Sequence, residues 1–282
     1  LVQLLQRATR SEDDGCITYI LDDNISKTIR KDIIDYNFIP DYILDSIADM
    51  DIEGCELISD NIRKQFGVYY LFDYDKNTKY RTGSLSKKLL NYKDYSDDSI
   101  DYKDEFDYFN NELMKALSVL SNQVIPNNIS KLALVSVPSS TVERDALATM
   151  RKSINCIENW YDEGKTETDF CCKKEIINCG NLLTRISDVS TSHLSKTQPM
   201  FYDATTSYKY KSRPSYIEHK NSIECSKSEI LERDDVAFII LDDISTRGTV
   251  MDACEDILID NGANKENIYK FALFKTKWCN ND

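Results

Sequence analysis

Three short apolar runs, over residues 131–137, 236–241 and 267–274, have the length and the β-branched content of buried strands. Continuous apolar runs of this kind are typical of strands that are covered on both faces of a parallel sheet. Apolar residues also recur every three or four positions over residues 105–123 and 250–258, which predicts amphipathic helices. Strands that alternate with helices predict an α/β fold with a central, mostly parallel sheet flanked by helices.

The first third of the chain predicts an additional α+β region whose role the sequence does not reveal. Its clearest strand covers residues 67–74, and a turn signal then precedes an expected returning strand over 79–82. We place a boundary between residues 104 and 105, with a single α/β domain over 105–282. The remaining expected elements are a strand over 16–21, helices over 25–36, 41–48, 142–160 and 223–233, and an exposed connection over 91–104.

The net charge and the lack of long apolar stretches in the sequence limit which partners and which cellular location we expect. The 282 residues carry a net charge of −13, and such an acidic surface repels nucleic-acid backbone, so we expect no general nucleic-acid binding. No stretch has the length or apolarity of a membrane span, and residues 1–10 lack the apolar core of a signal peptide. We therefore expect a cytoplasmic protein without a membrane partner, and we leave open whether it forms oligomers.

The nine cysteines are odd in number and scattered, which favours reduced thiols over a disulfide framework. A zinc cluster of Cys171, Cys172, Cys179 and His193 is the alternative, although the spacing does not match a known zinc pattern.

The residues after the apolar run 236–241 combine two carboxylates with a polar loop that contains one glycine. Asp242 and Asp243 stand where the strand is expected to end, and residues 244–249 lead into the helix that Asn261-Gly262 stops. The free N–H groups of a helix start stabilise a phosphate, and glycine lets the backbone approach it closely. Carboxylates beside a phosphate are suited to sugar hydroxyls or to a bridging Mg²⁺. An ordinary βα turn with a solvated acidic pair is the alternative.

Along residues 239–250, which read Ile-Ile-Leu-Asp-Asp-Ile-Ser-Thr-Arg-Gly-Thr-Val, the chain resembles the type I phosphoribosyltransferase family. The resemblance implies that Asp242 and Asp243 hold the ribose hydroxyls of phosphoribosyl pyrophosphate (PRPP) together with Mg²⁺. Arg247 and Val250 stand where the family has hydroxyl side chains. The loop residues that are implied to hold the 5′-phosphate are Thr246, Arg247, Gly248 and Thr249.

A second strand–loop–helix unit precedes the first in the chain. Residues 131–137 run into a small polar turn, which resembles the pyrophosphate loop of the same family. The resemblance implies that the backbone of Ser139, Ser140 and Thr141 meets the pyrophosphate. Arg144 and Arg151 would then add charge-assisted hydrogen bonds. A capped helix with surface arginines is the alternative.

Residues 186–215 have the composition of a mobile loop and form an island of positive charge. Together with the preceding Leu-x-Arg at residues 183–185, the segment resembles the flexible loop of competence-associated members of the family, and Arg213 is an implied substrate contact. Arg213, His219 and Ser222 also resemble a motif of uncharacterised bacterial members. For His219, a surface or capping histidine is the alternative.

The resemblance implies an enzyme that transfers the phosphoribosyl group of PRPP to a nitrogen nucleophile, with Mg²⁺ as the cofactor. Purine enzymes of the family that use 6-oxopurines carry an aspartate base at the position that Thr246 holds, so hypoxanthine and guanine are poor candidates as acceptors. The acceptor stays unidentified. The alternative is a regulatory or interaction module that kept a ribose-phosphate or nucleotide pocket and lost catalysis.

Overall fold

The computed structural model describes residues 56–59, 61–75, 78–79, 81–96, 101–145, 148–162, 172–189, 216–246 and 248–276. The elements expected over 16–21, 25–36 and 41–48, most of the segment 186–215, and both Arg213 and Arg247 lie outside these residues. The strands are β1 (Glu56–Leu57), β2 (Arg63–Gln65), β3 (Val68–Tyr74), β4 (Lys131–Ser136), β5 (Glu175–Asn178), β6 (Leu183–Arg185), β7 (Ile223–Cys225), β8 (Val236–Ser245) and β9 (Ile268–Thr276). The α-helices are α4 (Leu85–Lys93), α5 (Lys103–Val119), α6 (Val142–Asp145), α7 (Thr149–Asp162), α8 (Tyr216–Asn221) and α9 (Thr249–Asp260). Shorter helical turns are a π-helical turn at Leu120–Val124 and 3₁₀ turns at Glu229–Glu232 and Lys265–Asn267.

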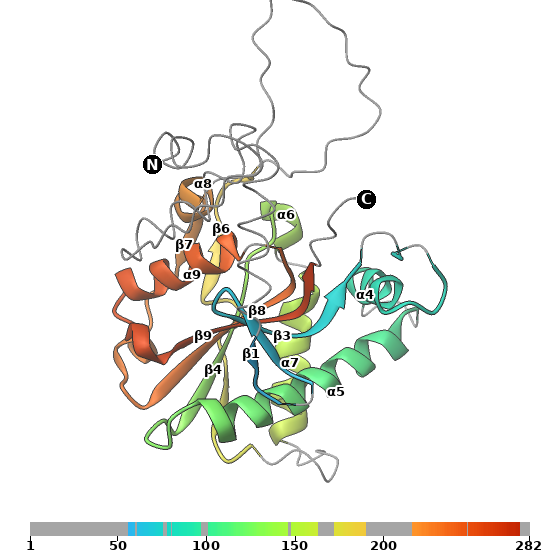
Figure 1. The fold of residues 1–282 in the computed structure, drawn as a ribbon. Coiled ribbons are helices and arrows are strands. Elements are labelled where there is room, and N and C mark those ends of the chain that lie inside the picture. The colour runs from blue at the N-terminus through green and yellow to red at the C-terminus, as the bar shows by residue number, and fades with distance from the viewer. Residues whose placement is uncertain are drawn as a thin grey trace, which may run out of the picture.

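Within the described residues, the main sheet has the strand order β1-β2-β3-β9-β8-β4-β5. Strands β3, β9, β8, β4 and β5 are mutually parallel, and β1 and β2 continue the sheet in antiparallel pairing. This architecture confirms the predicted α/β fold and places the three apolar runs next to one another at its centre. A separate antiparallel pair, β6 with β7, lies with α6 and α8 beyond the ends of the central strands (Figure 1).

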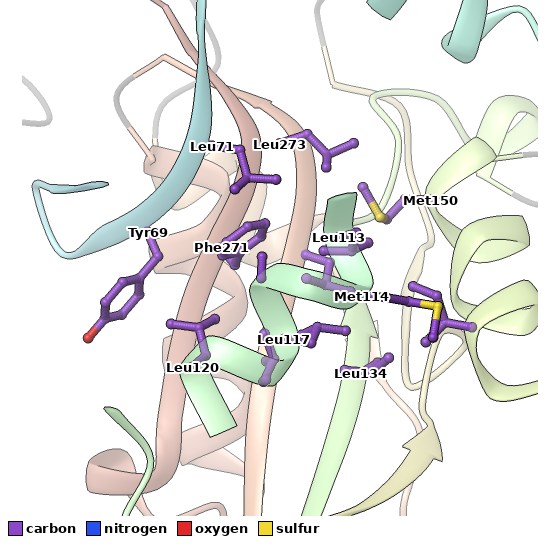
Figure 2. Close-up of a cluster of buried hydrophobic side chains, with 14 of the residues drawn as sticks. Tyr69, Leu71, Leu113, Met114, Leu117, Leu120, Leu134, Met150, Phe271 and Leu273 are labelled. Carbon is purple, nitrogen blue, oxygen red and sulfur yellow. The ribbon is translucent and has the colours of Figure 1, made fainter. Parts of the chain in front are cut away.

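Helices cover both faces of the sheet because the central strands are apolar on both faces. Alternate residues of β8 pack into two different clusters. Ala237, Ile239 and Leu241 join the cluster that contains α5 and α7, whereas Phe238 and Ile240 join the one that contains α9. Figure 2 shows Leu113, Met114, Leu117 and Leu120 of α5 and the following turn lying between side chains of β3, β9 and β4. The predicted helix over 105–123 is therefore confirmed, with its last turn in π form.

Four local predictions need correction. The described residues of the range 79–82 form no returning strand. β3 instead forms its hairpin with β2 upstream, through a turn in which Phe66 and Gly67 have positive φ. The helix expected over 223–233 is instead β7 followed by a 3₁₀ turn that Ser228 caps. The strand expected over 236–241 continues to Ser245. Residues 91–104 are not all an exposed connection, since Tyr92 is fully buried.

Residues on both sides of the predicted boundary at 104/105 contribute to one sheet and one apolar cluster. β3 pairs with β9 from Val68 to Tyr74, and Tyr92 of α4 packs against the rings of Phe106 and Phe109 on α5. The part of the first third that the structure describes is thus integral to the α/β core. None of the described helices has the length and the apolar character that crossing a bilayer requires.

Candidate ligand-binding site

The acidic pair lies inside the last part of β8, where the strand keeps only one neighbour. The pairing of β4 with β8 ends at Ser136 opposite Leu241, whereas the pairing with β9 continues to Ser245. Hydrogen bonding to β9 therefore extends the strand through Asp242 and Asp243, although their polarity predicts a strand end. Both carboxylates consequently stand at the carboxyl end of the central strands, beside the turn that follows β4. In open α/β sheets this edge is where ligands bind.

Lys93, from the first third of the chain, contacts this pair. Its Nζ lies 2.7 Å from Asp243 Oδ2. The lysine is the last residue of α4, and its carbonyl accepts a hydrogen bond from Thr149 Oγ1 at the start of α7. The preceding residue is also anchored to α7, since the Tyr92 hydroxyl and Ser153 Oγ are 2.7 Å apart. A rigid element therefore presents the ammonium group to the carboxylate.

The two carboxylates differ in their electrostatic environment. Burial, and then the neighbouring charge of Asp243, raise the pKa of Asp242 to about 7, although Lys93 opposes the shift. Burial alone would lower the pKa of Lys93, but the charge and the hydrogen bond of Asp243, together with the charge of Asp242, outweigh burial and raise the pKa. The pKa of the Asp242 carboxyl therefore lies near neutral pH.

The raised pKa of Asp242 predicts a pH dependence of stability. Between about pH 4, the pKa of an unfolded aspartate, and pH 7, the folded state holds a proton that the unfolded state has lost. The stabilisation of the folded state by the Asp242 carboxyl is thus fully present below about pH 4 and is lost as the pH rises through 7. Asp242→Asn should be less stable than the wild type near pH 4.5 and should improve relative to it by pH 7.5 in urea unfolding.

Asp235→Asn provides the control at the other end of the same strand. Hydrogen bonds from Arg233 and Ser130 hold the pKa of Asp235 below its usual range, so its contribution changes only in more acidic solution. The stability difference of this variant should be constant from pH 4.5 to 7.5. A constant difference for Asp242→Asn as well would contradict the assigned pKa.

The start of α9 has the features of an anion site. Gly248 is the N-cap residue, with φ +76°, and no side chain of the described residues caps the helix. A Cβ at Gly248 would lie 3.3 Å from Val68 Cγ2, so glycine is required here for both space and conformation. Ser245 is buried, and its Oγ has no hydrogen-bond partner among the described residues. A buried, unpaired hydroxyl beside an uncapped helix start fits a ligand oxygen.

The remaining loop residues of this start are held by β9. Thr246 Oγ1 lies 3.3 Å from Thr276 Oγ1, and the buried Lys275 donates from Nζ to the Thr246 carbonyl at 2.9 Å. Thr249 is the first residue of α9 and is half-buried. Three of the four implied phosphate-loop positions are therefore placed, and the fourth, Arg247, lies outside the described residues.

The turn after β4 is already partly occupied by carboxylates of the protein. Ser139 N donates to Asp145 Oδ1 at 2.7 Å, and Val142 N donates to Asp188 Oδ1 at 2.8 Å. Thr141 Oγ1 lies 3.4 Å from Arg144 N, in agreement with the predicted cap. The Ser139 N–H is therefore not free to meet an anion, which leaves the N–H groups of Ser140 and Thr141 for that role.

The arginines near this turn have different environments. Arg144 is exposed. Arg151 is mostly buried, and its Nη2 contacts Asp145 Oδ2 at 2.6 Å and the Leu183 carbonyl at 3.0 Å. Arg151 thus holds an internal carboxylate rather than facing a ligand.

Arg185, at the end of β6, binds the same turn from behind. Its Nε donates to the Ser139 carbonyl at 2.7 Å, and its Nη2 donates to the Pro138 carbonyl at 3.2 Å. Its Nη1 donates to Ser222 Oγ, and its backbone N donates to Asp145 Oδ2 at 3.0 Å. Arg185 therefore joins the β6–β7 pair to the end of β4.

His219 and Ser222, which the sequence singled out, lie in this network. Ser222 Oγ also contacts the His219 carbonyl at 3.0 Å. Burial, and then the charge of Arg185, lower the pKa of His219 to about 4, so the imidazole is neutral at pH 7. Its Nδ1 has no hydrogen-bond partner among the described residues. His219 is a half-buried member of the network rather than a surface cap.

Asp242 of the acidic pair and Arg185 both act electrostatically on one side chain of α9, Cys254. The buried thiol of Cys254 on α9 has a pKa that burial raises, that Arg185 lowers and that Asp242 raises. Both charges are therefore within electrostatic range of one side chain. Cys254 and the other described cysteines, Cys156, Cys172, Cys179 and Cys225, are free thiols.

The donor set suits Mg²⁺ only in part. Asp242 and Asp243 offer hard oxygen ligands, but no group of three or more His, Cys, Asp or Glu side chains gathers anywhere in the described ranges. The two carboxylates would therefore hold Mg²⁺ with water and with oxygens of a bound ligand completing its shell. Cys171 and His193 of the alternative zinc cluster lie outside the described residues.

Sequence reasoning missed Lys93, Asp145 and Arg185 as parts of this site. Lys93 carries no sequence signal, because its partner is distant in the chain. Arg185 had one, since it closely follows Leu182 and Leu183, and a charge that such apolar neighbours bury needs acceptors.

Comparison with known proteins does not extend these observations. The chain matches no protein-family model and no curated protein.

Proposed function

We propose that this protein binds PRPP, or another ribose 5-phosphate, with Mg²⁺, and transfers the phosphoribosyl group to a nitrogen nucleophile. One observation carries the proposal. The acidic pair Asp242–Asp243 stands at the carboxyl end of β8, and the same loop leads into the uncapped start of α9 beside the unpaired Ser245 hydroxyl. Carboxylates suit the ribose hydroxyls and the metal, while the helix start suits the 5′-phosphate.

In this proposal each residue positions or neutralises part of the ligand. Gly248 and Thr249 offer backbone N–H groups to the 5′-phosphate, and Arg247 adds positive charge. Asp242 and Asp243 accept hydrogen bonds from the 2′- and 3′-hydroxyls. Mg²⁺, when bound, supplies charge neutralisation to the pyrophosphate that leaves ribose C1. The transition state resembles an oxocarbenium ion, so positioning and electrostatic stabilisation supply most of the catalysis.

A second function has its own support. Lys93 already pairs with Asp243, and Asp145 already occupies the Ser139 N–H. An internal ion pair at one implied ligand contact and an internal hydrogen bond at another favour a module that senses a ribose phosphate or nucleotide without turning it over. Turnover of PRPP with nucleobases and other nitrogen nucleophiles distinguishes this module from the enzyme.

Ligand-dependent thermal unfolding tests the shared pocket. A ligand at a hundred times its dissociation constant that binds only the folded state adds about 2.7 kcal/mol. For a protein of this size the melting temperature should rise by roughly 5–10 °C with PRPP and Mg²⁺. Asp242→Asn combined with Asp243→Asn should remove most of this rise, because the charges that hold Mg²⁺ and the hydroxyls are gone.

The matched control is the acidic pair at the other end of β8. Asp234→Asn combined with Asp235→Asn makes the same chemical change and should leave the ligand-induced rise intact. Arg247→Ala should weaken PRPP and ribose 5-phosphate equally if the guanidinium grips the phosphate. A wild-type protein with no shift for any ribose phosphate, with Mg²⁺ present, would refute the pocket.

A further inference from the structure

The buried charges behind the turn after β4 do not cancel. Asp145 is 3% exposed and Arg185 is 4% exposed, and the side chain of Arg151 is mostly buried too. Arg151 pairs with Asp145, which leaves the charge of Arg185 without a carboxylate on its guanidinium among the described contacts. His219 is neutral at pH 7 and adds nothing. Among the buried side chains, one positive charge is therefore in excess behind residues 138–139, and the exposed Asp188 is a second carboxylate that acts on Arg185.

The hydrogen bonds of Arg185 also fix which way the turn presents its donors. No described peptide bond is cis, and in a trans peptide unit the C=O and the following N–H point in opposite directions. Because the Ser139 carbonyl points at Arg185 Nε, the N–H of Ser140 points away from the guanidinium. That N–H has no acceptor among the described residues.

An unpaired N–H that points away from a buried cation on the other side of its peptide unit forms a local field that attracts an anion. The protein's own carboxylates near the turn do not satisfy this donor. Asp145 binds the N–H of Ser139, and the exposed Asp188 binds the N–H of Val142. The N–H of Ser140 is thus available to an external ligand. The negative charge of Asp188 limits how far a bound anion can extend toward α6.

We propose that Arg185 is a positioning residue for pyrophosphate: it holds the Pro138–Ser139 carbonyls so that the Ser140 N–H faces the ligand, and its buried charge stabilises the bound anion. This inference rests on the proposed function, because it assumes that the turn faces the pyrophosphate of PRPP. Arg185 touches no ligand in this scheme. It acts through the turn.

The test compares inorganic pyrophosphate with ribose 5-phosphate by titration calorimetry, with Mg²⁺ present. Arg185→Met removes the charge and all three side-chain donors, so pyrophosphate affinity should fall about tenfold or more. Ribose 5-phosphate affinity should stay within about twofold, since the α9 start is a separate contact. Raising the salt concentration should weaken pyrophosphate binding more steeply in the wild type than in the variant.

Arg185→Lys keeps the charge but cannot hold two carbonyls in a planar fork, so its pyrophosphate affinity should lie between those of the wild type and Arg185→Met. This variant also decides the question if Arg185→Met does not fold. Arg233→Met is the matched control, because it makes the same chemical change at an arginine that pairs with Asp235 before the start of β8, away from the turn after β4. It should bind pyrophosphate within about twofold of the wild type.

The outcomes separate the two proposals. Unchanged pyrophosphate affinity in both Arg185 variants overturns the positioning role, as does an equal loss of both ligands, which indicates a general structural defect. Wild-type protein that binds ribose 5-phosphate but not pyrophosphate also overturns it, and leaves the pocket at β8–α9. Wild-type protein that binds neither ligand overturns the proposed function itself.

Discussion

Replacing Phe109 with alanine should lower the free energy of unfolding by about 3–5 kcal/mol, which is the usual cost of a large cavity in a packed core. The Phe109 side chain is fully buried. Its ring packs edge-on against Tyr92 of α4, Phe72 of β3 and Phe274 of β9. The deletion therefore damages contacts on both sides of residue 104. The melting temperature should fall by roughly 6–20 °C in a calorimetric scan.

Tyr108→Ala is the control on the same helix. Tyr108 is 37% exposed, so its removal leaves less of a cavity and should cost less than half as much as the Phe109 substitution. Two separate thermal transitions in Phe109→Ala, one of them unshifted, would indicate that residues before and after 104 fold independently. A single shifted transition supports the shared core.

Asp145→Asn should also cost about 3–5 kcal/mol, because it leaves buried cations without their carboxylate. Asp145 accepts hydrogen bonds from Ser139 N, Arg151 Nη2 and Arg185 N. The side-chain NH₂ of asparagine would face at least one of these N–H groups, so that two hydrogen-bond donors would point at each other. Urea unfolding should show the loss as a lower midpoint with an unchanged slope.

Two further variants identify the cause of that loss. Asp188→Asn alters a carboxylate that is exposed and caps only Val142 N, and asparagine caps almost equally well, so its stability should be close to the wild type. Adding Arg151→Met to Asp145→Asn should restore part of the stability, since one of the unpaired cations is then removed. If Asp145→Asn is as stable as the wild type, the buried ion pair does not hold the turn.

Strong local patterns predicted the elements of the core, and long-range pairing decided the cases that failed. The apolar runs that became β4, β8 and β9 needed no partner to be recognised, and neither did the helical spacing of α5. By contrast, Asp242 and Asp243 belong to β8 only because β9 supplies hydrogen-bonding partners up to Lys275. No pattern within residues 242–245 contains that information.

Predictions of the site also succeeded where the pattern was local and failed where the contacts were long-range. The acidic pair and Gly248 are neighbours in sequence, so their spacing was sufficient to predict a loop at the start of a helix. Lys93 meets Asp243, and Arg185 meets Ser139, across long separations in the chain. Such contacts depend on the strand order and on the packing of α4, neither of which periodicity specifies. The helix predicted over residues 223–233 was wrong for a related reason, since β7 forms through its pairing with β6.

The parallel pairing of β3 with β9 constrains the order of events while the chain is being made. Tyr70 pairs with Ala272, and at a synthesis rate of ~5–20 residues per second roughly 10–40 s separate the appearance of the two strands. The central strands β8 and β9 are the last described strands to leave the ribosome. Until they emerge, β3 lacks its neighbour β9 and β4 lacks its neighbour β8. The nascent chain thus exposes two apolar strand edges for many seconds, a period in which chaperone binding competes with aggregation.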